Sequence, residues 1–429
     1  MGSEFKDLTV PFLEESCART RPGTASSIQT LGNIVVSIVG TGLLGLPFAF
    51  KIAGWFAGSI GVLVTGISTY YCMLLLIQCR DKQATEELTA ETKTYGDLGY
   101  RCLGNPGRYL TEFLIFISQC GGSVAYLVFI GQNLSSICKS QGYDDISVSL
   151  FIFMLVPVEI ALSWIHSLSA LAPFSIFADV CNVLAMAIVV KEDVEKVISG
   201  EFKFSDRIAV TSSIGGLPFA AGMAVFCFEG FGMTLALESS MTERGRFPCL
   251  LAKAFTGITL VYVVFGFSGY MAYGDQTRDI ITLNLPHNWS SLAVQIGLCL
   301  GLMFTFPIMV HPIHEIVEGK LETSGLCRKV YDNDDGIAAK VGKFGIYVNR
   351  AILIIVLALV ASFVPGFGVF ASFVGSTVCA LISFVLPAMF HLILLGPSLS
   401  LWQKTIDYCF FICGLLFAGY GTYNTIVGV

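Results

Sequence analysis

The stretch Ile38-Val39-Gly40-Thr41-Gly42-Leu43-Leu44-Gly45-Leu46-Pro47 lies in the middle of an uncharged run from Pro22 to Phe50. That run is long enough to cross a bilayer, which takes about 20 largely apolar residues in a helix. Its centre, however, holds three glycines and a proline, the residues that least favour a continuous helix. A helix broken at mid-membrane frees backbone N–H and C=O groups, which must then face protein or a water-filled site. Breaks of this kind form the substrate site in many secondary transporters.

The composition of the whole chain predicts a polytopic membrane protein. Of the 429 residues, 54% are hydrophobic and only 13% are charged, whereas a soluble domain carries about 25% charged residues. The net charge of −6 argues against nucleic acid as a partner. The 14 cysteines lie mostly inside apolar runs and form no Cys-x-x-Cys pair. We therefore interpret them as small apolar side chains and expect no metal and no cofactor.

Apolar runs of spanning length predict an all-α protein with eleven transmembrane helices. The expected spans are residues 27–50, 55–79, 110–138, 147–165, 169–190, 211–238, 251–273, 290–314, 346–364, 367–395 and 405–427. They form one transporter domain over residues 27–427, preceded by a polar tail over residues 1–26. The longest polar segments between spans, residues 80–109 and 316–345, are expected to hold local structure without forming a separate domain.

The positions of the basic residues predict the orientation. Of the 25 Lys and Arg residues, 18 lie on the side of the membrane that carries the N-terminus. Because cytosolic loops carry the excess of positive charge, we expect the tail and the segments 80–109 and 316–345 to be cytosolic. An odd number of spans then places the C-terminus on the opposite side.

A second break is predicted in the sixth span, which contains Phe226-Cys227-Phe228-Glu229-Gly230-Phe231-Gly232. A carboxylate at mid-membrane is costly, and two glycines beside it weaken the helix. Breaks in the first and sixth spans occupy corresponding positions in two halves of five helices, which must have opposite orientations. This arrangement predicts an inverted 5+5 repeat of the leucine-transporter type, with an eleventh helix outside the repeat. The alternative is that the glycines only allow close helix packing.

Three motifs resemble the amino acid/auxin permease family, a branch of a larger transporter superfamily. They are Gly40-Thr41-Gly42-Leu43-Leu44-Gly45-Leu46-Pro47-Phe48-Ala49-Phe50-Lys51, Phe228-Glu229-Gly230-Phe231-Gly232-Met233 and Leu171-Ala172-Pro173-Phe174-Ser175-Ile176-Phe177-Ala178-Asp179. The chain looks most similar to the plant vacuolar-type group that carries aromatic and neutral amino acids. The resemblance implies amino acid transport, proton coupling (symport) and a vacuolar (tonoplast) membrane, with the plasma membrane or another endomembrane as alternatives.

An α-amino acid is a zwitterion, so its site must offer partners for both charges. The N-terminal end of a half-helix at the first break presents N–H groups and a positive dipole to the carboxylate. The C-terminal end of a half-helix at the second break presents carbonyl oxygens to the ammonium group. The predicted substrate-binding residues are Gly40, Thr41, Gly42, Leu43, Leu44, Gly45, Phe226, Cys227, Phe228 and Gly230. Thr41 either adds a hydroxyl to the substrate or bonds to a carbonyl one turn back, and Phe226, Phe228 and Phe231 either wall a side-chain pocket or only pack.

Carboxyl groups inside the spans are candidates for binding the coupling proton, because burial favours the neutral form of an acid. Glu229 at the second break is the first candidate, with a purely structural hydrogen bond as the alternative. Asp179 in the fifth span is the second. Glu159 lies closer to a helix end and is expected to reach water, and Glu238 and Asp407 are expected at the membrane interfaces.

Other classes of function are disfavoured by what the sequence contains. Five scattered histidines supply no catalytic or metal-binding constellation, so we expect no enzyme. No ring of polar residues typical of a channel is evident. We expect a monomer in the lipid bilayer that moves an amino acid together with protons by alternating access. A sodium-coupled carrier and a transporter-like amino acid sensor without net flux remain open.

Overall fold

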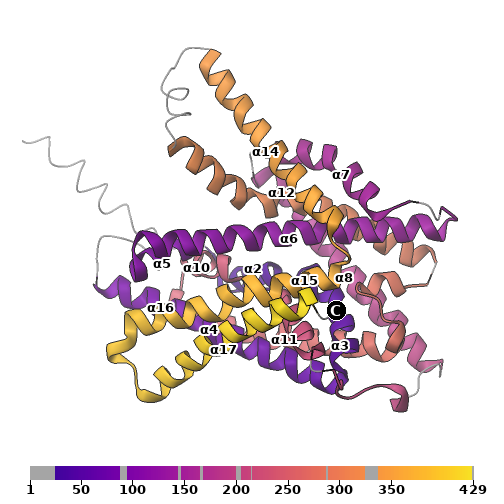
Figure 1. Cartoon of the computed structure of the whole chain (residues 1–429), viewed down its shortest axis with the longest axis horizontal. Helices are drawn as coiled ribbons and strands as arrows, with labels where there is room; N and C mark the ends of the chain where they lie inside the picture. Colours follow the sequence, from indigo (N-terminus) through magenta and orange to yellow (C-terminus); the bar gives the residue numbers. More distant parts are fainter. Residues whose placement is uncertain are drawn as a thin grey trace, which may run out of the picture.

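The computed structural model describes residues 25–86, 94–143, 146–164, 168–199, 204–213, 215–286, 288–323 and 337–427. This part of the chain is nearly all helical. Figure 1 shows the long helices gathered in one bundle, with α6 running across its whole length.

The helices of the N-terminal half begin with two that are separated by a short 3₁₀ segment. Their bounds are α2 (Ser27–Ile38), η1 (Thr41–Gly45), α3 (Leu46–Ala53), α4 (Trp55–Glu86), α5 (Tyr95–Leu103), α6 (Asn105–Ser140), α7 (Val148–Ser163) and α8 (Leu168–Ile198), with the 3₁₀ turn η2 (Phe204–Asp206) after them.

The C-terminal half repeats the interruption in its first span. Its bounds are α9 (Gly216–Cys227), α10 (Phe231–Ser240), α11 (Phe247–Tyr273), α12 (Trp289–Thr323), α14 (Ile337–Phe363), α15 (Phe367–Val374), the π-helical segments η6 (Gly375–Cys379) and η7 (Leu381–Val385), α16 (Leu386–Leu395) and α17 (Leu401–Val427). The 3₁₀ turns are η3 (Arg244–Arg246), η4 (Gly274–Gln276), η5 (Ile281–Asn284) and η8 (Gly396–Ser398).

A helix, or a chain of helical pieces, occupies each of the eleven segments that the sequence predicts as spans. Within the described residues, eight helices are long and apolar enough to cross a membrane, and nine if the bent pair at the N-terminus is one span. The all-α membrane architecture is therefore confirmed, whereas the number of eleven crossings stays a prediction. The helices also extend beyond the predicted spans: α4 continues to Glu86 and α12 to Thr323, both inside segments expected to be loops.

The first span breaks where the sequence predicts. Ser26 and Gln29 cap the start of α2 reciprocally, each side chain accepting a hydrogen bond from the other residue's backbone N–H. The helix ends at Ile38, and η1 and α3 resume at an angle of 44° to it. Pro47 lies in the first turn of α3, where its missing N–H costs no hydrogen bond.

Helix α9 lies at the centre of the packing. It contacts α3, α4, α15, η6 and α17, and so touches both the first break and the π-helical part of the tenth predicted span. Glycines make the closest of these contacts: a Cβ on Gly375 would lie 1.8 Å from the Gly222 carbonyl oxygen, a distance that no side chain can occupy. The glycine-rich sequence thus serves close packing here, in addition to the breaks.

Candidate functional site

The first break exposes the start of a helix. Gly40 has an extended backbone, and the first hydrogen bond of η1 runs from the Leu43 N–H to the Gly40 carbonyl at 3.3 Å. The N–H groups of Thr41 and Gly42 precede that bond, as the first donors of any helix do. They point the positive end of the η1–α3 dipole into the break, which suits an anion.

The second break exposes the end of a helix. Helix α9 ends at Cys227, and Phe228, Glu229 and Gly230 separate it from α10. The Phe228 N–H still bonds to the carbonyls of Ala224 and Val225, both at 3.2 Å. Carbonyl oxygens at the end of such a helix carry partial negative charge, which suits a cation.

Tyr262 of α11 joins the two breaks. Its hydroxyl lies 3.1 Å from the carbonyl oxygen of Ile38 and 3.1 Å from that of Cys227. The tyrosine is fully buried. Because one hydroxyl proton serves both acceptors, the bond holds the end of α2 against the end of α9.

The two breaks touch directly through Gly42. A Cβ placed on Gly42 would lie 3.1 Å from Cys227 Sγ and 3.3 Å from a ring carbon of Phe226. A Cβ on Gly45 would lie 3.0 Å from the ring of Phe367. A Cβ on Gly40, by contrast, would meet nothing within 4 Å. The break is therefore tightly packed around Gly42 and open beside Gly40.

The remaining predicted residues of the first break are buried with their side chains in the core. Thr41, Leu43 and Leu44 are 1–3% exposed. Among the described residues, none hydrogen-bonds to the Thr41 hydroxyl, whereas Thr30 and Thr234 bond to a carbonyl one turn back. The local bond that the sequence left open is thus not formed, and the hydroxyl is available to a ligand.

The phenylalanines of the second break divide into two groups. Phe226 is half-buried and lies against Gly42, with its ring centre 6.4 Å from that of Phe367. Phe228 is 1% exposed and packs between Phe255 and Tyr262, and Phe231 is fully buried. Phe226 is therefore the one of these three whose ring lies at the break. Phe228 can reach a ligand there only through its backbone.

Glu229 lies at the second break and is half-buried. No hydrogen bond or ion pair joins its carboxylate to the described residues, and its electrostatic neighbours are Tyr95 and Cys379. The alternative of a structural hydrogen bond is therefore not realised in this conformation. Asp179 belongs to α8, but its side chain lies outside the described residues.

Three carboxylates expected near water are buried instead. Glu159 is 0% exposed, and neither of its oxygens has a partner in the described part of the chain. Glu238 is 1% exposed and pairs with Arg80, because α4 extends far enough to cover α10. Asp407 is 0% exposed and lies 2.6 Å from His391, because α16 folds back on α17. A position near a helix end does not predict exposure to water where a neighbouring helix covers that end.

An open pocket of about 330 Å³ lies at the end of α6 that leads toward α7. Its lining includes Lys139, Arg278 and Gln132. Gln132 also donates to Asp279 at 3.0 Å and accepts from the Phe367 N–H at 3.3 Å. Since Phe367 contacts Gly45 and Phe226, Gln132 links the pocket to the two breaks.

Two interrupted helices facing each other at the centre of a helical bundle define the leucine-transporter fold. The solved structure described as "Crystal structure of MhsT in complex with L-phenylalanine" superposes with a TM-score of 0.53, at 14% sequence identity, over 95% of this chain and 100% of that one. At this identity the similarity shows the fold alone.

Residues 23–427 match the family described as "Transmembrane amino acid transporter protein", and the chain belongs to this family. It is 66% identical to "Amino acid transporter ANT1" of Arabidopsis thaliana over 99% of this chain and 98% of that protein. It is 27% identical to "Vacuolar amino acid transporter 3" of Schizosaccharomyces pombe, over 94% of this chain and 58% of that protein. The family resemblance predicted from the three motifs is confirmed, as is the prediction of a transporter rather than an enzyme.

Proposed function

We propose that this protein is a proton-coupled secondary transporter of neutral and aromatic amino acids that works by alternating access around the two helix breaks. The observation that carries the proposal is the contact of Gly42 with Cys227, which sets the N-terminal end of η1 opposite the C-terminal end of α9. An α-amino acid carries an anion and a cation two bonds apart on one carbon. The N–H groups of Thr41 and Gly42 suit the carboxylate, and the carbonyls of Phe226 and Cys227 suit the ammonium group.

The preference for neutral and aromatic side chains rests on what surrounds the breaks. Phe226 and Phe367 present rings there, and Leu43 and Leu44 complete an apolar wall. In the described residues, the cation–ring contacts are those of Lys51 with Phe48 and Lys196 with Tyr273, not with Phe226 or Phe367. An acidic substrate would therefore find no such partner for its second carboxylate at these rings. The 66% identical relative is named an amino acid transporter, which supports the substrate class.

Proton coupling rests on Glu229. Its carboxylate is half-buried at the break and makes no hydrogen bond with the described residues. A proton removes the cost of holding that charge away from water, and the cost changes when the site opens to one side or the other. Asp179 is the second candidate.

The proposed topology and location are supported by the charge distribution and by the relatives. We assign the N-terminus to the cytosol on the basis of the basic residues. The name of the fission yeast relative supports a vacuolar membrane. The protein is proposed to act as a monomer, because both breaks of the site belong to one chain.

Uptake into proteoliposomes containing the purified protein tests the proposal. Labelled L-phenylalanine should accumulate when a pH gradient is imposed and should not accumulate when a sodium gradient replaces it. Accumulation with sodium alone would favour a sodium-coupled carrier. Binding of phenylalanine without any flux would favour an amino acid sensor.

A further inference from the structure

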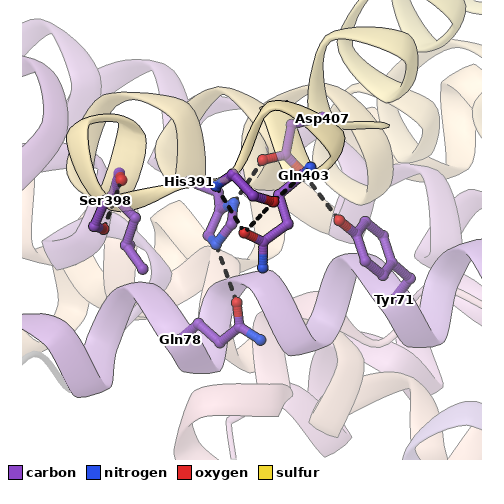
Figure 2. Close-up of polar contacts among 8 residues, drawn as sticks. Tyr71, Gln78, His391, Ser398, Gln403 and Asp407 are labelled. Atoms are coloured by element: carbon purple, nitrogen blue, oxygen red, sulfur yellow. Dashed lines mark hydrogen bonds and ion pairs between the residues drawn. The ribbon is translucent and has the colours of Figure 1, made fainter. Parts of the chain in front are cut away.

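A buried polar network lies away from the two breaks, where α4 meets the turn between α16 and α17. Figure 2 shows His391 between Asp407 on one side and Gln78 on the other, with Tyr71 beyond Asp407. His391 Nδ1 lies 2.6 Å from Asp407 Oδ2, and His391 Nε2 lies 3.0 Å from Gln78 Oε1. The Tyr71 hydroxyl donates to Asp407 Oδ1 at 3.1 Å.

The hydrogen bonds of the network determine how many protons it holds. The Gln78 oxygen can only accept, so His391 Nε2 must carry a proton. The 2.6 Å contact between His391 Nδ1 and Asp407 requires a second proton, on either the nitrogen or the oxygen. The pair thus holds two protons and is neutral overall. A carboxylate beside a neutral imidazole would hold only one.

Burial of the pair makes loss of the second proton energetically costly. His391 is 1% exposed and Asp407 is 0% exposed. Among the described residues, no Lys or Arg forms an ion pair with them. Loss of the second proton would leave a net negative charge out of contact with water, which costs several kcal/mol unless a cation or solvent compensates it. Gln78 is exposed, so the histidine end of the network is the end where a proton can enter or leave.

The ionisable groups that surround the pair come from several helices. From α4, Tyr71, Cys72 and Cys79 interact electrostatically with Asp407. On α4, Arg80 pairs with Glu238. The other ionisable groups on the described parts of α17 and of the elements packed against α16 and α17 are Tyr70, Asp81 and Lys82 on α4, Tyr95, Asp97, Tyr100, Arg101 and Cys102 on α5, Cys227 on α9, Cys379 on η6, and Lys404, Tyr408, Cys409, Cys413, Tyr420 and Tyr423 on α17 itself.

The network joins parts of the fold that can move relative to one another. His391 and Asp407 belong to α16 and α17, and Tyr71 and Gln78 belong to α4. Between the core and α16, the same span passes through two π-helical segments, η6 and η7. π-Helical turns within α-helices frequently occur at functional sites, where the backbone ladder is already perturbed.

We propose that the Asp407–His391 pair is a proton-binding site, separate from the substrate site, which holds α4 against the α16–α17 turn while the proton is bound. When the His391 Nε2 proton passes to water beside Gln78, the pair becomes negative, and the contact is stable only if water reaches it. Proton release and opening of this end of the bundle are thereby coupled. Figure 1 shows the α16–α17 turn at the same end of the bundle as α5 and α10.

Thermal unfolding of the purified wild-type protein, measured as a function of pH, tests the proposal without requiring transport. Above about pH 6.5 an unfolded chain holds carboxylate and neutral histidine, so the folded pair binds one proton more. Its contribution to stability is fully present below that pH and is lost as pH rises through the release of the second proton. The unfolding midpoint of the wild type should therefore fall across this transition.

Three variants separate the proton site from a merely structural network. The double variant Asp407→Asn with His391→Gln keeps polar groups without the shared proton, and its unfolding midpoint should lack the transition. Tyr71→Phe removes the hydroxyl that donates to Asp407 Oδ1 while both members of the pair remain, so the transition should persist at a different pH. Tyr95→Phe removes a buried hydrogen bond to the Ile382 carbonyl of η7, and should lower the midpoint equally at every pH.

The proposal fails if the wild type shows no such transition, or if the double variant keeps it. Should the double variant not fold, Tyr71→Phe still decides the matter, because it leaves the pair intact. A transition at the same pH in wild type and Tyr71→Phe would mean that another group titrates.

Discussion

Gly42 lies directly against Cys227: a Cβ on the glycine would sit 3.1 Å from the cysteine sulfur and 3.4 Å from its Cα. The glycine belongs to the first helix break and the cysteine is the last residue of α9, so this contact joins the two breaks. It explains why a residue without a side chain stands at this point of the chain. It also sets the helix ends with opposite partial charges next to each other.

Gly42→Val should reduce phenylalanine uptake by about tenfold or more. A branched side chain cannot fit beside Cys227 and Phe226, and overpacking of this kind costs about 1–3 kcal/mol. Uptake and the amount of folded protein in the membrane are the measurements. Gly232→Val is the matched control, because a Cβ at Gly232 meets nothing within 4 Å. Equal uptake by both variants would show that Gly42 is not at the site.

Gly40→Ala tests whether the open space beside Gly40 is needed by the substrate, because the packing of the protein does not use it. No atom lies within 4 Å of a Cβ at this position, and the extended backbone there accepts alanine. The variant should therefore keep the wild-type unfolding temperature while its KM for phenylalanine rises. An unchanged KM would place the substrate away from Gly40.

Tyr262→Phe should weaken both the fold and the site. The substitution removes the hydroxyl that lies between the Ile38 and Cys227 carbonyls, and leaving buried carbonyls unpaired costs about 1–3 kcal/mol. We expect a lower unfolding temperature and slower transport. Tyr270→Phe is the control on the same helix, since its hydroxyl accepts from the Ile208 N–H instead. If the two variants transport equally well, the Tyr262 bridge has no role in function.

Glu229→Gln should keep exchange of labelled for unlabelled phenylalanine and lose accumulation driven by a pH gradient. Glutamine resembles the protonated acid but cannot release a proton. Both activities are measured in the same proteoliposomes. If Glu229→Gln still concentrates phenylalanine and Asp179→Asn does not, the coupling proton belongs to Asp179. If both variants concentrate it, the coupling mechanism proposed here is wrong.

The first break was predictable because its cause is local. Three glycines and a proline within an apolar run disfavour a helix wherever the chain folds, and α2 does end at Ile38. The second break had a similar local signal in Glu229 and the two glycines that follow it, Gly230 and Gly232. The family motifs were predictable for the same reason, since each is a short continuous stretch.

The pairing of distant side chains was not predictable. His391 and Asp407 are separated by a helix end and a turn, and Tyr71 and Gln78 come from the other end of the chain. Only the helix packing brings them together. The sole hint was a histidine inside the otherwise uncharged stretch from Ala351 to Gln403. The burial of Glu159 and Glu238 likewise depends on neighbouring helices.

Competition by substrate analogues tests most directly whether the two helix ends bind the two charges of an amino acid. Uptake of labelled L-phenylalanine into proteoliposomes is measured with an excess of unlabelled L-phenylalanine, L-phenylalaninamide or 3-phenylpropionate. The amide lacks the carboxylate, and the acid lacks the ammonium group. The account predicts strong competition by phenylalanine and little by either analogue. Competition by phenylalaninamide as strong as that of phenylalanine would contradict it.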